Sequence, residues 1–422
     1  MFDYENIKKQ DKEIYDAIVG EEKRQKGGLE LIPSENYVSL AVREAAASVL
    51  TNKYAEGYPG KRYYGGQEFT DKVEDLARER AKKLFGAKYA NVQPHSGANA
   101  NLAMYFALLE PGDSVLGMDL SHGGHLTHGH PVTYITKIFK FTRYKIKDTK
   151  TGEIDYDEML EVAKKVKPKI LLAGFSSYTR ELDYEKFVAI AREVGAISVM
   201  DAAHIAGLIA GDALKNPFDF GFDIITSTTH KTLRGPRGGL ILVREDKELA
   251  QKIDKALFPG LQGGPLMHQI AAKAVAFGEA LDSSFKDYAK QVIKNAKVME
   301  EVFKEAGAEL VNGGTDNHML LLDVQKSFGI DGAVAQDVLD EVGITLNKNV
   351  VPDDPNPPMR PSGIRFGTPA ITSRGFDKEA CVALSYTMLS VLKNPHDEKT
   401  KAEARATVRE LAGRFSVRKS YL

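Results

Sequence analysis

The chain has 422 residues, 43% of them hydrophobic and 27% charged, so it is long enough for a large domain and a smaller one. Its 57 lysine and arginine residues nearly cancel its 58 aspartate and glutamate residues, which excludes a global field that would recruit nucleic acid or an anionic membrane. A single cysteine, Cys381, excludes an intrachain disulfide and a thiolate metal cage, and suits a reducing compartment.

The sequence shows no targeting or membrane segment. The first residues, MFDYENIKKQ, are charged from residue 3 onward, and no stretch reaches about 18 uninterrupted apolar residues. We therefore expect a cytoplasmic protein that has neither a membrane nor a nucleic acid as a partner.

The first part of the chain has helical patterns. The segment KKQDKEIYDAIVGEEKRQ indicates a helical arm that packs on another surface. In TDKVEDLARERAKKLFGA, helical spacing predicts one buried face, and Asp71 with Glu74 suits the start of the helix. The residues expected on that face are Val73, Leu76, Ala77 and Leu84.

Strands and helices then alternate as far as about residue 280. Short apolar runs separated by helices are typical of a mostly parallel sheet with helices on both faces, and catalytic side chains are expected where its strands end. The expected strands are YANVQP, the run after EPGD, KILLAGF, AISVMDAAH, DIITSTTHK and GGLILVR, and the expected helices include SGANANLAMYFALL and residues 184–194.

Beyond about residue 280 the pattern changes to long amphipathic helices around short strands such as MLLLDV and GITLN. The expected helices are 283–307, 377–393 and 396–415. The predicted fold class is therefore α/β: a large domain with a mostly parallel sheet of the seven-stranded type, a smaller α/β C-terminal domain and an N-terminal helical arm. We place the arm at 1–53, the large domain at 54–280 and the small domain at 281–422.

A lysine within TSTTHKTLRGPRGG (226–239) is the first candidate for chemistry. Lys231 directly follows an expected strand, where an amine can be held still and partly dehydrated, and an amine with a lowered pKa can form a Schiff base. The alternative is a solvated lysine in a turn. The preceding hydroxyl residues and His230 favour the Schiff base.

A carboxylate ends the expected strand AISVM. Asp201 is followed by small residues that would let a flat ring lie against the backbone. A buried carboxylate is costly unless it meets a cation, and a protonated pyridine nitrogen is such a cation. The alternative is a carboxylate that caps the next helix.

Three loops suit phosphate or ring binding. HSGANAN (95–101) offers backbone amides at a helix N-terminus, and FPGLQGGP (258–265) is a second glycine-rich loop; ordinary turns are the alternative for both. SHGGHLTHGH (121–130) holds four of the ten histidines, but glycines interrupt it and it contains no carboxylate. For this segment we favour an imidazole stacked on a cofactor ring and expect no metal site.

Two further segments have alternative interpretations. YAEGYPGKRYYGG (54–66) is both polar and aromatic, which is typical of a site loop or of an oligomer contact. In SGIRFGTPA (362–370), Arg365 could bind a carboxylate through its forked guanidinium or belong to a structural ion pair.

Taken together, the motifs resemble the serine hydroxymethyltransferase family, enzymes of the aminotransferase-like fold type I that depend on pyridoxal 5'-phosphate (PLP). The resemblance covers essentially the whole chain. The matching segments are ELIPSENY, LTNKYAEGYPGKRYYGG, NVQPHSGANAN, HGGHLTHG, DAAHIAGLIA, TTHKTLRGPRGG, QGGPLMH, GGTDNH, NKN and SGIRFGTPAIT.

The resemblance implies a PLP site. Lys231 would hold the cofactor as an internal aldimine, Asp201 would pair with the pyridine nitrogen, and His125 would stack on the ring. The other residues implied in cofactor binding are Ser96, Gly97, Ser176, His204 and Arg237, with Tyr54, Gly263 and Gly264 from a neighbouring subunit.

The resemblance also implies substrate sites that are shared in a homodimer whose N-terminal arm packs on the partner subunit. Arg365 with Ser34 would bind the amino-acid carboxylate, and Glu56 with Tyr64 would reach in from the partner. The implied catalytic residues are Lys231, Glu56 as the proton carrier, Tyr64 and His230, which would tune the reaction. The implied folate-binding residues are Leu120, Gly124, His125, Leu126 and Asn349.

The implied activity is the reversible transfer of the serine hydroxymethyl group to tetrahydrofolate, through an external aldimine of PLP, giving glycine and 5,10-methylenetetrahydrofolate. A side aldolase activity on β-hydroxy amino acids and a place in one-carbon metabolism and amino-acid biosynthesis are also implied. A threonine aldolase or a hydroxymethyltransferase for a modified pterin would share the cofactor chemistry. In a non-enzymatic scaffold or RNA-binding protein the cofactor site would be vestigial, although all its residues are present.

Overall fold

A computed structural model describes residues 4–417 of the chain. These residues form two compact units. The large unit is Ala41–Lys290, and the small unit combines the residues up to Leu40 with those from Gln291 onward. Within residues 4–417, every helix is too short or too polar to cross a membrane.

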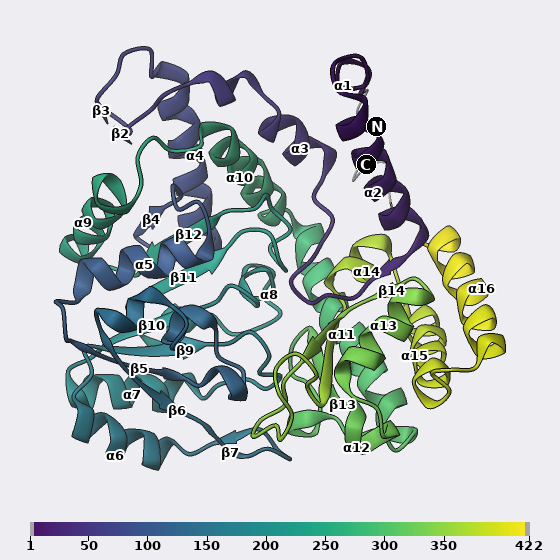
Figure 1. Cartoon of the computed structure of the whole chain (residues 1–422). Coiled ribbons are helices and arrows are strands. Elements are labelled where there is room, and N and C mark those ends of the chain that lie inside the picture. The colour runs from purple at the N-terminus through teal and green to yellow at the C-terminus, as the bar shows by residue number, and fades with distance from the viewer. Residues whose placement is uncertain (1–3, 418–422) are drawn as a thin grey trace. The chain divides into compact units, whose positions relative to one another are not determined.

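The large unit is built on a seven-stranded sheet with the order β4-β12-β11-β10-β9-β5-β6 (Figure 1). Neighbouring strands from β11 to β6 pair in parallel, whereas β12 is antiparallel to both β11 and β4. This arrangement confirms the predicted mostly parallel sheet. The strands are β4 (Tyr89–Asn91), β5 (Ser114–Met118), β6 (Lys140–Tyr144), β9 (Ile170–Gly174), β10 (Ile197–Asp201), β11 (Ile224–Thr228) and β12 (Gly239–Val243).

Both faces of this sheet are buried. Successive side chains of a strand point to opposite faces. Leu172, Val199 and Ile224 belong to one core cluster together with residues of α5. Leu171 and Met200, the neighbours of the first two along their strands, are equally buried on the opposite face. This is why the strands read as continuous apolar runs in the sequence.

The helices of the large unit follow the strands in alternation, as predicted. They are α3 (Leu40–Ala46), α4 (Glu68–Phe85), α5 (Gly97–Leu108), α6 (Tyr156–Val166), α7 (Tyr184–Val194), α8 (Ala206–Ala210), α9 (Lys247–Lys255) and α10 (Met267–Ala280). Two short hairpins, β2 (Gly57–Tyr58) with β3 (Lys61–Arg62) and β7 (Ile146–Asp148) with β8 (Glu153–Ile154), complete the unit.

Helix α4 corrects two details of the prediction. It begins at Glu68, three residues before Asp71, and Leu76, which was expected in the core, is 50% exposed. Phe69 is also exposed, at 67%. Of the other residues expected on the inner face, Ala77 is buried, and Val73 and Leu84 are half-buried. The buried residues are Thr70, Glu74, Ala77, Ala81 and Phe85.

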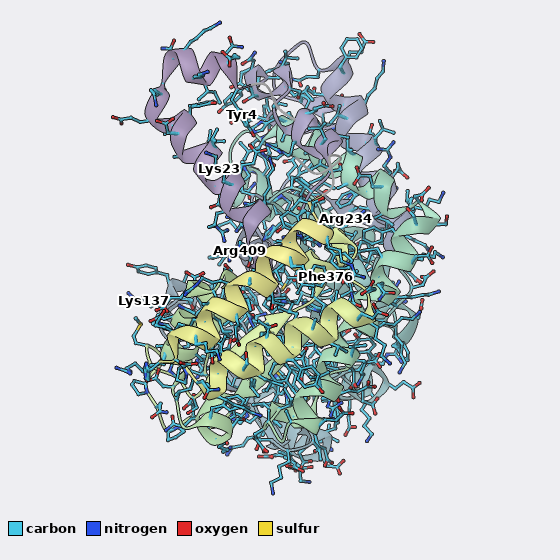
Figure 2. The ribbon with its side chains drawn as sticks, turned by 90° about the vertical axis from the view of Figure 1, so that its right-hand side faces the viewer. Tyr4, Lys23, Lys137, Arg234, Phe376 and Arg409 are labelled. Atoms are coloured by element: carbon cyan, nitrogen blue, oxygen red, sulfur yellow. The ribbon has the colours of Figure 1, made fainter. Side chains whose placement is uncertain are left out.

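The small unit contains the antiparallel sheet β13-β16-β15 and a parallel pair, β1 with β14. Its long helices were predicted within a few residues, and α15 and α16 lie side by side (Figure 2). The elements are α1 (Glu5–Gln10), α2 (Lys12–Gly27), β1 (Leu29–Glu30), α12 (Val324–Phe328), α13 (Gly332–Glu341), β13 (Met319–Asp323), β14 (Ile344–Thr345), β15 (Asn347–Asn349), β16 (Gly363–Gly367), α14 (Pro369–Arg374), α15 (Lys378–Lys393) and α16 (Glu398–Arg414). Helix α11 (Ser283–Glu305) begins in the large unit and continues into the small one.

One edge of the seven-stranded sheet collects the loops that carry many of the predicted site residues. Parallel strands end at the same edge, and the antiparallel β12 begins there, because Gly239 pairs with Thr228. The segments after β4, β5, β9, β10 and β11 therefore leave the sheet at this edge.

Gly207 of α8 offers a test of how tightly this edge is packed. A Cβ at this position would overlap the backbone of Thr232, whose hydroxyl accepts a hydrogen bond from the Gly207 amide at 3.0 Å. We expect Gly207→Ala to lower the free energy of unfolding by about 1–3 kcal/mol, as overpacking does. Urea denaturation measures this change.

Gly413→Ala in α16 is the matched control, because a Cβ there meets open space. Alanine is the better helix former, by up to about 1 kcal/mol, so this variant should be at least as stable as the wild type. Equal stability of the two variants would contradict the close packing at Gly207.

Candidate active site

Most of the predicted site residues of the large unit lie at the edge where the strands end, and the others form a second cluster. Asp201 is the last residue of β10 and pairs in register with Gly174 of β9 and Thr226 of β11. Lys231 lies three residues after β11, in a bend, and is half-buried. The topology thus brings an amine and a carboxylate to neighbouring strand ends.

Asp201 is buried and hydrogen-bonded through both carboxylate oxygens. Oδ2 accepts from Nδ2 of Asn101 at 2.9 Å and contacts Nε2 of His128 at 3.0 Å, and Oδ1 accepts from the amide of Ala203 at 3.1 Å. Burial alone would raise the pKa of Asp201, but the hydrogen bond and charge of His128, the charge of His125 and the bond from Asn101 hold that pKa well below its usual range. The carboxylate is therefore ionised.

Sequence reasoning missed two of these partners. Asn101 and His128 lie within quoted motifs, but no spacing rule connects either of them to Asp201. Asn101 is fixed in turn, because its Oδ1 accepts from Thr226 Oγ1 at 2.6 Å and its Nδ2 donates to Thr127 Oγ1 at 2.8 Å. The partners come from α5 and from the loop after β5, so only the folded chain reveals them.

The donor atoms of His125, His128 and Asp201 lie within 4.8 Å of one another, close enough to surround a metal ion. Hydrogen bonds account for the same arrangement without an ion. His128 pairs with Asp201, and Nδ1 of His125 lies 2.8 Å from Thr127 Oγ1. The first contact orients the His128 imidazole toward the carboxylate, and the second orients the His125 imidazole toward Thr127.

The N-terminus of α5, the predicted anion cradle, lies at the same edge. Ser96 is the N-cap, and its hydroxyl oxygen accepts from the amide of Asn99 at 3.2 Å. A Cβ on Gly97 would lie 2.7 Å from Cγ2 of Thr228, and a Cβ on Gly239 would overlap the Ser96 carbonyl. Glycine at both positions allows the start of this twelve-residue helix to lie against β11 and β12, with its first amides available to an anion.

The segment around Lys231 is tied to the segment after Asp201. Thr232 Oγ1 donates to the carbonyl of His204 at 2.9 Å, and the His204 side chain is buried. Burial, with the charges of the exposed Arg237 and of Lys231, lowers the pKa of His230 to about 3. The imidazole beside Lys231 is therefore neutral at neutral pH.

Ser176 and Gly124 belong to loops that contact each other. The amide of Ser176, after β9, donates to the Gly123 carbonyl at 2.6 Å. A Cβ on Gly124 would overlap the Met118 carbonyl at the end of β5. Leu120 and Leu126 lie in 3-10 helices on either side of this turn, and Leu126 is exposed.

A second cluster gathers the residues implied to act in a partner's site. Tyr54 donates to Glu56 Oε1 at 3.2 Å, and the Glu56 charge raises the pKa of Tyr54, so the phenol stays protonated. The rings of Tyr54 and Tyr64 pack edge to face, with their centroids 5.2 Å apart. A Cβ on Gly263 would lie 3.6 Å from Glu56 Oε1, and one on Gly264 would lie 3.3 Å from the Tyr54 ring.

This second cluster faces outward. Tyr54 and Tyr64 are exposed, and Glu56 and Gly263 line an open hollow of about 540 Å³ together with Tyr63. The structure therefore brings the residues of this cluster together on a surface of the large unit.

The remaining predicted residues, Arg365, Ser34 and Asn349, lie in the small unit. Arg365 on β16 donates to Asn347 Oδ1 through Nε at 3.2 Å and through Nη2 at 3.1 Å, and burial lowers its pKa to about 10, so it remains a cation at neutral pH. The segment that leads to Ser34 runs beside the same strand, because the amide of Gly367 donates to the Leu31 carbonyl at 2.8 Å.

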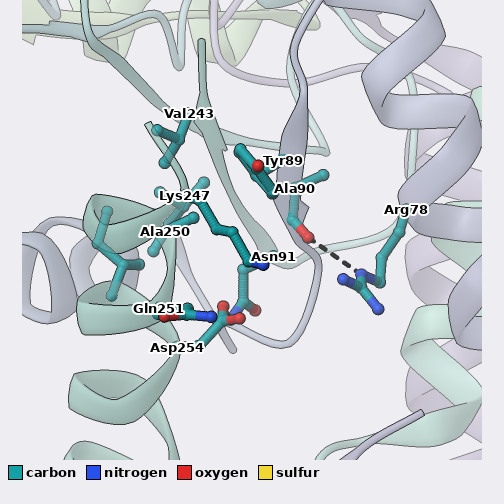
Figure 3. Close-up of a pocket in the computed structure, with 11 residues that line it drawn as sticks. Arg78, Tyr89, Ala90, Asn91, Val243, Lys247, Ala250, Gln251 and Asp254 are labelled. Carbon is teal, nitrogen blue, oxygen red and sulfur yellow. Dashed lines mark hydrogen bonds between the residues drawn. The ribbon is translucent and has the colours of Figure 1, made fainter. Parts of the chain in front are cut away.

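A separate pocket of about 180 Å³ lies at the edge strand β4 (Figure 3). Arg78 donates to the Ala90 carbonyl at 3.3 Å, and Asn91 donates to Asp254 Oδ1 at 2.7 Å. Burial raises the pKa of Asp254, and Asn91 and Arg78 offset this only in part. None of the predicted site residues is among the described residues that line this pocket, so it is distinct from the candidate site.

An α/β fold that gathers a lysine, a buried ionised carboxylate and a helix N-terminus at one sheet edge is typical of an enzyme whose ligands bind at the carboxyl ends of the strands. Residues 7–388 match the family model described as serine hydroxymethyltransferase. The chain belongs to the serine hydroxymethyltransferase family. Family membership supports hydroxymethyl transfer between serine and glycine with tetrahydrofolate, so the chain is a transferase of one-carbon metabolism.

The low pKa of Asp201 predicts an acid-dependent loss of stability. Below about pH 4, the carboxyl of Asp201 binds more protons in the unfolded chain than in the folded chain. The ionised carboxylate therefore stabilises the folded chain above that pH, and this stabilisation is lost as the pH falls. We expect Asp201→Asn to reduce the free energy of unfolding by about 1–3 kcal/mol at pH 6, as loss of hydrogen bonds to a charged group does, and by less at lower pH.

Urea denaturation of the wild type and of Asp201→Asn between pH 6 and pH 3 measures this difference. Asp337→Asn, at an exposed position of α13, controls for the loss of a surface carboxylate. A difference between wild type and Asp201→Asn that grows as the pH falls would contradict the prediction.

Proposed function

We propose that the chain is a PLP-dependent serine hydroxymethyltransferase. It would transfer the serine hydroxymethyl group reversibly to tetrahydrofolate, giving glycine and 5,10-methylenetetrahydrofolate, with a side aldolase activity on β-hydroxy amino acids. The observation that carries this proposal is the buried, ionised Asp201 at the sheet edge that also holds Lys231 and the cradle at Ser96.

The residues present fit PLP. Among the described residues, Asp201 pairs with the imidazole of His128 and with no lysine or arginine, and a protonated pyridine nitrogen would add a further cation. The amides at the start of α5 suit a phosphate, and the amine of Lys231 suits an aldehyde. Three chemically different parts of one cofactor thus have a counterpart at this edge.

When bound, PLP would supply a cationic ring that withdraws electrons from the substrate bond to be broken. Lys231 would hold its aldehyde, Asp201 would keep the proton on its ring nitrogen, and His125 would lie against the ring. The further contacts would come from Ser96 and Gly97 to the phosphate, Ser176 and His204 to the ring hydroxyl, and Arg237, with Tyr54, Gly263 and Gly264 contributed by a partner.

The substrate groups would be bound by the remaining residues. Arg365, with Ser34, would bind the amino-acid carboxylate, because its guanidinium stays charged and already donates to an amide oxygen. Glu56 would take the proton of the substrate hydroxyl, supported by Tyr64. His230 would tune the reaction as a neutral imidazole. The pterin would lie near Leu120, Gly124, His125, Leu126 and Asn349.

A homodimer would complete the site. Exposed apolar side chains lie before, within and after the segment of the second cluster along the chain: Val49 is 79% exposed and Tyr63 is 73% exposed, and Phe69 and Leu76 form the outer apolar face of α4. Large exposed apolar side chains of this kind suit a protein interface. None of the sixteen residues of α2 is buried, which supports an arm, residues 1–53, that packs on the partner subunit.

Visible absorption of the purified protein tests the proposed activity. We expect added PLP to give an absorption band that borohydride abolishes, and glycine with tetrahydrofolate to give a new band at longer wavelength. Glu56→Gln should lower kcat for tetrahydrofolate-dependent transfer by about 10²–10⁴, as the loss of a general acid or base does, and leave PLP affinity unchanged.

Glu68→Gln, an exposed carboxylate on α4, is the matched control and should retain full activity. Bound PLP with no response to tetrahydrofolate would instead favour the threonine aldolase or the modified-pterin enzyme. A protein that binds no PLP would favour the non-enzymatic scaffold.

The dimer predicts a specific effect at α4. Leu76→Asp places a charge on the exposed apolar face, and burying that charge in an interface is costly. We expect sedimentation velocity to show a shift from dimer to monomer at micromolar concentration.

Ala402→Asp, at an exposed position of α16, introduces the same charge and should remain dimeric. A wild-type monomer, or a Leu76→Asp dimer as tight as the wild type, would be evidence against an interface at α4.

A further inference from the structure

Lys273, in the middle of α10, is a buried cation outside the candidate site residues. Its side chain is only 2% exposed, and it interrupts the apolar face of the helix. Burial lowers its pKa to about 7, and the charge of Glu74 opposes this shift. A buried ammonium is costly, and a well-packed apolar residue is often the more stable choice. This cost calls for a structural or functional reason.

All three donors of the Lys273 ammonium are used. Nζ donates to the carbonyls of Val92 at 2.6 Å, Pro94 at 3.0 Å and Gly239 at 2.9 Å. Every acceptor is a backbone oxygen, so this side chain holds main chain in place.

The three carbonyls belong to the base of the anion cradle. Val92 and Pro94 lie in the segment that joins β4 to the N-cap Ser96, and Gly239 is the first residue of β12. The amide of Gly239 also donates to the Pro94 carbonyl at 2.9 Å. Lys273 thus fixes the path of the chain as it enters α5.

The same segment is tied to a second glycine-rich loop. Oε1 of Gln262 accepts from the amide of His95 at 3.0 Å, and its Nε2 donates to the Gln93 carbonyl at 3.1 Å. The cradle segment and the loop that carries Gly263 therefore share hydrogen bonds.

A buried carboxylate connects the segment to the loop of residues 54–66. Gln93 donates to Glu74 Oε1 and to the Gly57 carbonyl, both at 2.9 Å, and Arg62 donates to Glu74 Oε2 at 2.7 Å. The Arg62 guanidinium also donates to the Ala55 carbonyl at 2.9 Å, next to Glu56. Movement of the cradle segment would disturb these bonds.

We propose that Lys273 is a positioning residue that sets the geometry of the anion cradle at Ser96 and Gly97 through its three backbone carbonyls. It does not touch the anion. It holds the entry to α5 so that the first amides of the helix converge on the phosphate. This inference rests on the proposed binding of PLP at the cradle.

The test compares two ligands that differ only in the phosphate. The apoprotein of the wild type and of Lys273→Met is titrated with PLP and with pyridoxal, followed by visible absorption. We expect Lys273→Met to lose at least about tenfold in PLP affinity, comparable to the loss of one charge-assisted hydrogen bond, and to keep its pyridoxal affinity. A general loss of protein stability would lower the affinity for both ligands by the same factor.

Lys401→Met is the matched control, because Lys401 is a buried lysine of the small unit that pairs with Glu341. It should leave the ratio of PLP to pyridoxal affinity unchanged. Gly238→Ala perturbs Lys273 without removing its charge, since the new Cβ would overlap Cε of Lys273 and lie 2.8 Å from Nζ. Gly238→Ala should also lower the ratio of PLP to pyridoxal affinity. It replaces Lys273→Met in the test if that variant does not fold.

An unchanged ratio in Lys273→Met, or in Gly238→Ala where only that variant folds, would overturn the inference while the proposed function stands. Failure of the wild type to bind PLP would overturn the proposed function and the inference with it.

Discussion

The burial of an ionised carboxylate at the end of β10 is the constraint on which the large unit depends. Asp201 has no cationic side chain of lysine or arginine among its ion pairs in the described chain, so amide and imidazole groups must solvate it. One of these donors, Asn101, lies on α5 and is held by Thr226 of β11. Solvating the carboxylate therefore fixes α5 against the sheet, and the start of α5 is the proposed anion cradle.

A buried amine, that of Lys273, is bound to the segment that leads into α5. Lys273 is solvated by three backbone carbonyls, as Asp201 is solvated by donors, and neither ion neutralises the other through a direct pair. Groups that are solvated by fixed protein dipoles need no reorganisation when a charged ligand arrives. Such fixed groups would suit the proposed binding of a phosphate and a ring cation at the same time.

Much of the fold could be predicted from local patterns. The strands of the large sheet are apolar runs because both faces are covered, and α5 begins where Ser96 can cap it. On α4 the prediction placed both Leu76 and Ala77 in the core, but only Ala77 is buried, and only the packed chain distinguishes these two apolar residues. Among the candidate site residues, those at strand ends could be predicted from sequence motifs. The role of Lys273 could not be predicted, since a lysine in a helix is normally expected to be exposed to solvent.

Helix α4 connects the cradle segment to the exposed surface proposed as the dimer interface. Its inner face carries Glu74, which accepts hydrogen bonds from Arg62 and Gln93, and its outer face carries Phe69 and Leu76. If a second copy packs on the outer face, the contact lies one helix diameter from the carboxylate that connects the loop of residues 54–66 to the cradle segment. In such a dimer, the loop of residues 54–66 would contribute to the partner's site, the cradle would belong to the chain's own site, and both would be held by α4. Shared sites of this kind require such a support, because a residue contributed across an interface is positioned only as well as the element that carries it.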